Sequence, residues 1–261
     1  MQTINTILSQ SELKLLENTI LKFGRIATFE QISSLFEATE ARGSIRRKVA
    51  LLAKRGWLVR IRKGQYVVIT DISTLGSNDL SEYVIAQAIH KDSYISFENA
   101  LQYHGLFDQL LNTVGSVTAA YARKHIVQKT TYLFSRVKKD LYFGFTQEVV
   151  GESYRVNMAE KEKALLDMLY FKTSAYAVSI VLEKLREYKH RLDFKKLQEY
   201  AKRYGVGMVR TAGFLLDQAG VDTTELLTYA KRKQNSYNKL TAKASKFDAK
   251  WRLYYDPYII T

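Results

Sequence analysis

Apolar residues near the start of the chain recur every three or four positions, as on one face of a helix: Leu13, Leu16, Ile20 and Phe23. Ser9 precedes this pattern and Glu12 stands three residues after Ser9, which is the spacing of a capping box. Gly24 follows the last apolar position, as helix-ending glycines do. The pattern therefore predicts a helix between Ser9 and Gly24.

A second helix start follows soon after the first helix. Thr28 and Gln31 repeat the capping-box spacing. The apolar face of this short helix consists of Phe29, Ile32, Leu35 and Phe36. A third helix is expected from about Ser44 to Arg55, with Gly56 as its C-terminal cap.

Two β-rich runs come next and predict a hairpin. They are Trp57–Ile61 and Gln65–Ile69, and the tight turn between them ends in Gly64. Three helices followed by a hairpin are typical of a winged helix-turn-helix. Residues 1–72 are therefore predicted to form such a domain.

The rest of the chain predicts a larger second domain. Residues 71–80 are rich in Ser, Thr, Gly and Asn without periodicity, which predicts a linker. Residues 80–228 mix helical and strand patterns and are mostly helical toward their C-terminal end. The fold class is therefore expected to be α+β, a winged helix-turn-helix followed by a mixed α/β domain.

Individual elements of the second domain are also expected. Two helical pieces lie within 81–104, with Ser96 as a cap, and strands are expected at 114–120, 130–137, 141–145 and 154–156 around a basic turn at 122–125. Asn157 and Glu160 are expected to form a capping box for a helix whose core positions are Leu165, Leu166 and Leu169. The helical pattern continues to about residue 233, with breaks near 174, 189–193, 205–207 and 220–222.

Positive charge is concentrated at the two ends of the chain, and the net charge is +14. Residues 1–70 hold 12 basic and 5 acidic side chains, and residues 229–261 hold 8 basic and 2 acidic ones. The stretch from 41 to 70 carries nine basic residues and no acidic one. Clustered positive charge favours a polyanionic partner.

The third helix can be divided into two faces at about 100° per residue. Ile45, Val49 and Leu52 fall on one face and are expected to pack against the first two helices. Arg47 and Lys54 fall on the opposite face, which in a winged helix-turn-helix enters the major groove of DNA. Arg47 is the best candidate for reading a base edge, since arginine pairs bidentately with guanine.

The remaining candidate DNA contacts lie at the start of the third helix and on the wing. Arg42, Ser44 and Arg46 are expected to reach phosphates near the helix start. Arg60, Arg62 and Lys63 cluster at the tip of the hairpin, where backbone or minor-groove contacts are made.

Several segments resemble the AbiEi family. The resemblance lies in residues 93–106 (SYISFENALQYHGL), 131–137 (TYLFSRV), 142–145 (YFGF) and 159–167 (AEKEKALLD), and together with the winged domain it spans roughly residues 8–170. The helix of the family begins Pro-Glu-Lys-Ala, whereas this chain has Ala159-Glu160-Lys161-Glu162-Lys163-Ala164. That departure leaves the roles of Glu160 and Lys163 open.

The resemblance implies a function as well as a fold. Members of the family are antitoxins and transcriptional autorepressors of bacterial AbiE toxin–antitoxin systems. They bind inverted repeats in their own promoter, and the second domain opposes a nucleotidyltransferase-like toxin, for which no stable complex is required. Two protomers on one double-stranded operator are expected; whether they are monomers in solution stays open, because no coiled-coil heptads are present.

Two other functions are weighed. One is a winged-helix regulator of other genes with a ligand-sensing or dimerisation domain. The other is a DNA-processing nuclease, for which Glu187, Lys189 and Asp193 offer metal-binding chemistry. The chain has no cysteine, its four histidines lack metal-ligand spacing, and its glycines form no phosphate-binding loop. We therefore expect no enzyme activity, no catalytic or metal site and no cofactor.

Two expectations concern the tail and the location of the protein. Residues 229–261 interleave lysines with aromatic residues; Trp251, Tyr254 and Tyr255 are expected to dock the tail on the second domain, and nucleic-acid binding by the tail is the alternative. No secretory signal precedes the first helix, and apolar runs such as Ala175–Leu182 are too short to cross a bilayer. A cytoplasmic protein without a membrane partner is expected.

Overall fold

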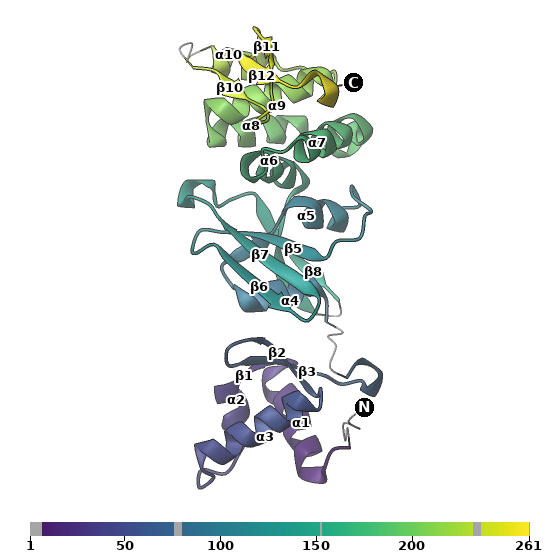
Figure 1. The fold of residues 1–261 in the computed structure, drawn as a ribbon, viewed down its shortest axis with the longest axis vertical. Helices are drawn as coiled ribbons and strands as arrows, with labels where there is room; N and C mark the ends of the chain where they lie inside the picture. The colour runs from purple at the N-terminus through teal and green to yellow at the C-terminus, as the bar shows by residue number, and fades with distance from the viewer. Residues whose placement is uncertain (1–6, 76–79, 152, 232–235, 261) are drawn as a thin grey trace. The chain divides into compact units, whose positions relative to one another are not determined.

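The computed structural model describes residues 7–75, 80–151, 153–231 and 236–260. The chain divides into two compact units. Unit 1 comprises residues 1–91 with the short stretches 125–131 and 150–154, and unit 2 comprises residues 92–124, 132–149 and 155–261. The mixture of helices and sheets is of the α+β type predicted (Figure 1).

Unit 1 contains a small helical group and a three-stranded sheet. Its elements are α1 (Gln10–Phe23), β1 (Ile26–Thr28), α2 (Phe29–Ser33), α3 (Arg42–Lys54), β2 (Leu58–Arg62), β3 (Gln65–Val68), η1 (Ile72–Thr74) and α4 (Glu82–Ile89). The strand order is β1-β3-β2, with both pairs antiparallel. The predicted linker 71–80 includes η1, and its residues 76–79 lie outside the described residues.

Local capping explains where the first two helices begin. Ser9 accepts a hydrogen bond from the Glu12 backbone N–H, and the Glu12 carboxylate accepts one from the Ser9 N–H. Thr28 and Gln31 form the same reciprocal pair at the start of α2. Both predicted capping boxes are confirmed. Helix α2 ends at Ser33, however, so Leu35 and Phe36 lie beyond its last turn.

The core of unit 1 joins one face of each helix to the sheet. Its buried members are Leu16, Ala27, Phe29, Ile32, Ile45, Val49, Leu52, Trp57, Leu58 and Val68. The predicted inner face of α3 is confirmed, since Ile45, Val49 and Leu52 are all buried. The strand β1 was not predicted, because three residues are too few to show a period of two.

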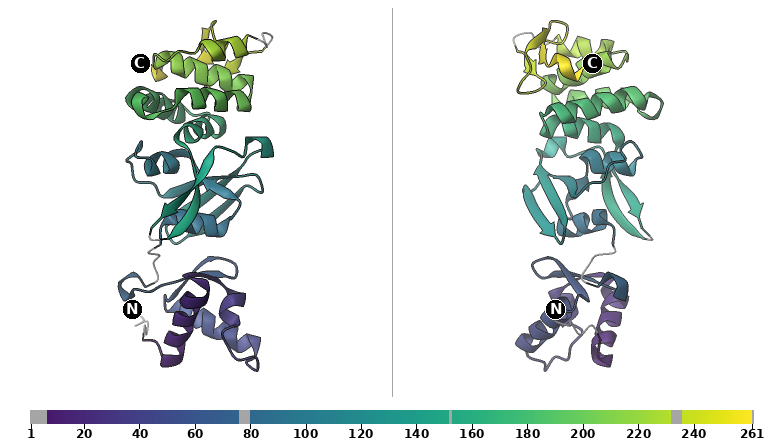
Figure 2. Two further views of the ribbon diagram at one scale, coloured as in Figure 1. Left: turned by 180° about the vertical axis from the view of Figure 1, so that it is seen from behind. Right: turned by 45° about the vertical axis from the view of Figure 1, so that its right-hand side comes forward.

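Most strands of unit 2 belong to a six-stranded sheet with the order β6-β7-β5-β4-β9-β8. The strands are β4 (Ser93–Ile95), β5 (Thr113–Thr118), β6 (Arg123–Val127), β7 (Thr130–Arg136), β8 (Phe145–Val150) and β9 (Tyr154–Ala159). β4 pairs antiparallel with β5 and parallel with β9. The strand pairs β6–β7 and β8–β9 lie at the two edges of the sheet, as Figure 2 shows.

Helices follow the sheet in layers. They are α5 (Phe97–Tyr103), α6 (Lys161–Phe171), α7 (Ala175–Glu187), α8 (Phe194–Tyr204), α9 (Val206–Gln218) and α10 (Thr224–Ala230), with short η2 (Lys139–Leu141) and η3 (Lys189–Arg191). α6 packs on α5 from one side and on α7 and α8 from the other, and α9 packs between α8 and α10 (Figure 1). The predicted breaks near 174, 189–193, 205–207 and 220–222 are all confirmed.

Three predictions about the second part of the chain are wrong. The basic turn expected at 122–125 is part of strand β6, and the turn falls at Gln128, which has a φ of 54°. The strand expected at 141–145 begins only at Phe145. Asn157 does not cap a helix but lies in β9, where its amide donates to the Ser93 carbonyl at 3.1 Å. The two helices expected in 81–104 are confirmed as α4 and α5, and the strand between them, β4, was not predicted.

The C-terminal residues form a second, small sheet in unit 2. Its strands are β10 (Asn238–Lys239), β11 (Lys246–Asp248) and β12 (Leu253–Tyr255), in the order β10-β12-β11, followed by η4 (Pro257–Ile259). Trp251 is 1% exposed, and its indole N–H donates to the Asp217 carboxylate at 2.6 Å. Tyr255 packs on Phe214 of α9, with ring centroids 4.9 Å apart. The tail therefore packs against α9.

No helix within the described residues has the length and apolar character of a membrane span.

Candidate nucleic-acid interface

Helix α3 presents one basic face to solvent. Arg47 and Lys54 are exposed on the side of the helix opposite the buried Ile45, Val49 and Leu52, and Arg46 is exposed at the edge of that side. The guanidinium carbon of Arg46 lies 6.0 Å from the centroid of the Phe29 ring. The side chains of Arg47 and Lys54 make no hydrogen bond or ion pair with any described residue. Their charges are therefore free to meet an anionic partner.

The start of α3 is less available, because acidic residues surround it. Arg42 lies 3.6 Å from the Glu30 carboxylate, and Ser44 donates to Glu40 at 2.9 Å. Lys48 also pairs with Glu40, at 2.7 Å. Hydrogen bonds from Lys48 and Ser44 hold the pKa of Glu40 below its ordinary value. The expected phosphate contacts of Arg42 and Ser44 would have to compete with these carboxylates.

The basic residues of the β2–β3 hairpin also differ from one another. Arg60, Arg62 and Lys63 are all exposed around the turn at Gly64, and the register between β2 and β3 shifts between Arg60 and Arg62. The Arg62 guanidinium donates to the Gln65 side chain at 2.5 Å and to the Ile89 carbonyl at 2.9 Å. Arg62 therefore links the hairpin to the end of α4 within unit 1, whereas Lys63 has no such contact in the described residues.

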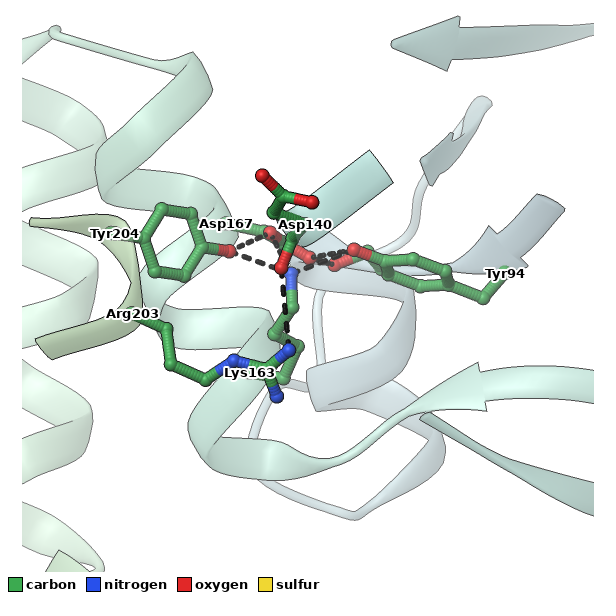
Figure 3. A network of polar contacts seen from close by, with 7 residues as sticks. Tyr94, Asp140, Lys163, Asp167, Arg203 and Tyr204 are labelled. Atoms are coloured by element: carbon green, nitrogen blue, oxygen red, sulfur yellow. Dashed lines mark hydrogen bonds and ion pairs between the residues drawn. The ribbon is translucent and has the colours of Figure 1, made fainter. Parts of the chain in front are cut away.

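A second polar cluster lies buried in unit 2 and is shown in Figure 3. We call it the Lys163 network; its members are Lys163, Asp167, Tyr94, Ser96 and Tyr204. Lys163 and Asp167 are completely buried, and their charged atoms lie 2.5 Å apart. Because their spacing is i,i+4, both side chains leave the same face of α6.

Every charged group of the Lys163 network has hydrogen-bond partners. The Lys163 ammonium donates to Asp167, to the Tyr94 hydroxyl at 2.7 Å and to the Tyr204 hydroxyl at 2.6 Å. The Asp167 carboxylate also accepts from Tyr204 at 2.5 Å and from Ser96 at 2.7 Å. The network therefore joins β4, the start of α5, α6 and α8.

Burial controls the protonation of these groups. It lowers the pKa of Lys163, while the Asp167 carboxylate acts in the opposite direction. Burial and the neighbouring Asp167 charge raise the pKa of both Tyr94 and Tyr204, so both phenols keep the protons that they donate. Lys163 and Asp167 have no exposed surface, and their hydrogen bonds join the layers of unit 2 to one another.

Glu160, whose role the sequence left open, also holds helices together. It lies at the N-cap position of α6 without a side-chain capping bond. Its carboxylate accepts from the Tyr200 hydroxyl at 2.5 Å and from Lys196 at 3.3 Å. Glu160 therefore links the start of α6 to α8.

The residues weighed for a nuclease are engaged in helix ends. Glu187 pairs with Lys184 at 3.1 Å, and the Asp193 carboxylate caps α8 by accepting from the Lys196 backbone N–H. Within the described residues, no group of three or more His, Asp or Glu side chains is arranged to hold a metal ion.

Comparisons with known proteins establish the fold alone. The chain matches no protein-family model. It is similar to the crystal structure of the RV2827C protein from Mycobacterium tuberculosis, with a TM-score of 0.64 and 11% identity over 96% of this chain and 92% of that one. It is also 24% identical over 124 residues to CBL-interacting serine/threonine-protein kinase 21 from Arabidopsis thaliana. The match covers 48% of this chain and only 30% of the length of the kinase.

Sequence reasoning did not find the Lys163 network, although a signal for it was present. A lysine and an aspartate stand four residues apart among the apolar residues of Lys163-Ala164-Leu165-Leu166-Asp167. Charged residues in the apolar phase of a helix indicate a buried pair. In the sequence, Tyr94 lies 69 residues from Lys163 and Ser96 lies 71 residues from Asp167, so no local pattern identifies these partners.

Proposed function

We propose that the protein is a DNA-binding transcriptional regulator and that unit 1 is a winged helix-turn-helix. The order of helices α1, α2 and α3 followed by the β2–β3 hairpin supports this assignment. In the proposal α3 enters the major groove and Arg47 reads a base edge. Arg46 and Lys54 contact phosphates beside it, and Lys63 and Arg60 contact the backbone from the wing.

The observation that carries the proposal is the division of α3 into two faces. Its inner face is fully apolar and buried, whereas Arg46, Arg47 and Lys54 on its outer face are exposed. A surface helix without a binding role usually carries charges of both signs, because opposite charges at i,i+4 attract one another and stabilise the helix. An outer face with only positive charge is instead suited to phosphate.

The experiment is a gel-shift titration of the full-length protein on the DNA upstream of its own gene, at two salt concentrations. Arg47→Ala is expected to weaken binding to the preferred site by roughly 1–3 kcal/mol, about 5- to 150-fold. Lys22→Ala, which removes the same charge from an exposed position on α1, is the matched control and should bind as the unchanged protein does. Equal affinity for upstream and random DNA would contradict the proposal.

The more specific role that we propose is an autorepressor and antitoxin, and this rests on the resemblance to the AbiEi family. In that role, two protomers occupy an inverted repeat whose half-sites lie about 34–36 Å or a multiple apart. Mass photometry of the complex should give two protomers per operator; one protomer would contradict this arrangement. Co-expression with the nucleotidyltransferase-like partner should restore growth, and failure to restore growth would leave a regulator without antitoxin activity.

A further inference from the structure

The small C-terminal sheet has two different faces. On the inner face, Leu253 is fully buried and Tyr255 packs on α9. The strand register places Lys239 of β10 and Phe247 of β11 opposite Tyr254 of the central strand β12. Directly paired residues point to the same side of a sheet, and neighbours along a strand point to opposite sides. Lys239, Tyr254 and Phe247 therefore form a row on the outer face.

Aromatic rings dominate this outer face. The Tyr254 ring lies 4.9 Å from that of Phe247 and 5.4 Å from that of Tyr237, measured between centroids. Tyr237 is 60% exposed and Phe247 is 45% exposed. We call Tyr237, Tyr254 and Phe247 the aromatic row. Three adjoining rings, two of them exposed, form a contiguous patch of the kind that marks an interaction site.

Positive charge borders the aromatic row. The Lys239 ammonium lies on the same side of the sheet, 6.0 Å from the Tyr254 ring centroid. The exposed Arg252 donates to the carbonyl of Ser236, the residue before the first ring of the row. Lys246 is paired with Tyr255 and therefore points to the other side of the sheet. Two basic side chains, Lys239 and Arg252, thus lie beside the rings.

Two arginines fix the position of the first ring. Arg210, which is 1% exposed, donates to the carbonyl of Ser236 at 2.6 Å and to its hydroxyl at 3.0 Å. Arg252 donates to the same carbonyl at 3.2 Å. Ser236 directly precedes Tyr237. The backbone at the start of the aromatic row is thus held before any ligand arrives, which lowers the entropic cost of binding.

We propose that the aromatic row binds single-stranded nucleic acid. Unpaired bases stack on Tyr237, Tyr254 and Phe247, and the phosphates lie against Lys239 and Arg252. Flat rings bordered by basic side chains are the chemistry that recognises exposed bases without sequence preference. Duplex DNA does not fit this face, because its bases are already stacked on one another. The site lies in unit 2 and does not depend on the function proposed for unit 1.

The test is fluorescence anisotropy of the full-length protein with labelled oligo-uridylate and oligo-thymidylate of about 12 nucleotides, within the ~4–16 nucleotides that comparable platforms cover. The double variant Tyr237→Ala/Phe247→Ala is expected to bind at least about 10-fold more weakly, because alanine cannot stack on a base. Tyr121→Ala, which removes a 68% exposed ring elsewhere in unit 2, is the matched control and should bind normally. Preference for one oligonucleotide tells whether RNA or DNA is the ligand.

Two further measurements keep an unfolded variant from being mistaken for a binding defect. Lys239→Gln removes only exposed charge and should also weaken binding, with a smaller dependence on salt, whereas Lys246→Gln on the other side of the sheet should bind normally. Photocrosslinking with a 5-iodouracil oligonucleotide should label the peptide that contains Phe247 or Tyr254. Absence of binding to both oligonucleotides would overturn the proposal. So would unchanged binding by both the aromatic double variant and Lys239→Gln, or crosslinks confined to residues 42–63.

Discussion

Lys163 is a charged side chain that is completely removed from water. Transfer of a single ammonium into a protein interior costs several kcal/mol, and attraction to a partner offsets this only when the geometry is good and other hydrogen bonds complete the shell. Asp167, Tyr94 and Tyr204 together accept three hydrogen bonds from this ammonium. The side chain is therefore tolerated because four elements of unit 2 meet around it.

Removing one partner of the Lys163–Asp167 ion pair should lower the free energy of unfolding by more than the intact pair contributes to it. Lys163→Met leaves the Asp167 carboxylate buried without its counter-charge, and we expect the free energy of unfolding of unit 2 to fall by about 3–5 kcal/mol. Lys195→Met, at an exposed position on α8, should change it by less than about 0.5 kcal/mol. Equal stability of the two variants would show that the network does not hold unit 2 together.

The measurement can be confined to unit 2. The chain has two tryptophans, Trp57 in unit 1 and Trp251 in unit 2. In a Trp57→Phe background, Trp251 fluorescence during urea unfolding reports on unit 2 alone. This separation matters because two units need not unfold in one transition.

At the scale of elements, the small sheet is attached to the end of α9 through one carboxylate. Asp217 accepts from the Trp251 indole at 2.6 Å, from Lys250 at 2.5 Å and from the Thr223 hydroxyl at 2.6 Å. Gly213 of α9 makes room for the same indole, since a Cβ there would lie 2.2 Å from the ring. The sheet is thus both hydrogen-bonded and closely packed on the helix.

This attachment should make the stability of the small sheet depend on pH. Burial acts to raise the pKa of Asp217, but the hydrogen bonds from Lys250, Thr223 and Trp251 prevail, so the pKa lies below its ordinary value of 3.8. A carboxyl whose pKa is depressed by folding stabilises the protein above the unfolded-state pKa, and this contribution is lost as the pH falls through the folded-state pKa.

Asp217→Asn should therefore lower the free energy of unfolding at pH 7 by about 1–3 kcal/mol, since charged hydrogen bonds are replaced by weaker ones. The difference between this variant and the unchanged protein should shrink as the pH falls below about 3.8. This difference in the free energy of unfolding is measured by urea unfolding followed through Trp251 fluorescence at several pH values. Asp108→Asn, at an exposed position, is the control; a difference that is constant with pH would rule out the carboxylate charge as the cause.

At the scale of the whole molecule, the two proposed nucleic-acid surfaces belong to different compact units. The α3 face lies in unit 1 and the aromatic row in unit 2, matching the two ends of the chain where positive charge is concentrated. Substitutions in separate units with no shared partners usually have additive effects. The two surfaces are therefore expected to be separable by mutation.

Salt dependence tests this separation. Arg46→Gln/Arg47→Gln should weaken operator binding and reduce the slope of log K against log salt by about 0.9 for each phosphate that is no longer neutralised. Lys239→Gln should leave that slope unchanged while reducing the slope for single strands, by about 0.7 for each such phosphate. If either variant changed both slopes equally, the two surfaces would form one site.

The elements that short-range patterns predicted are those whose stabilising contacts are themselves local. The capping boxes at Ser9 and Thr28 form between residues three positions apart, and the two faces of α3 follow from helix geometry alone. The basic outer face of α3 was visible for the same reason. Tertiary contacts, by contrast, changed the availability of Arg42 and Arg62, because their partners Glu30 and Ile89 lie 12 and 27 positions away along the chain.

Long-range packing decided the rest. Ser96 precedes α5 as expected, but its hydroxyl bonds Asp167 rather than the helix backbone. β4 is buried at all three positions, so it shows no alternation by which a strand is identified. The Lys163 ammonium donates to the Tyr94 hydroxyl although the two residues are 69 positions apart in the sequence. Patterns in the chain therefore sufficed for helix ends and faces, while the central sheet, the Lys163 network and the aromatic row arise only where distant segments meet.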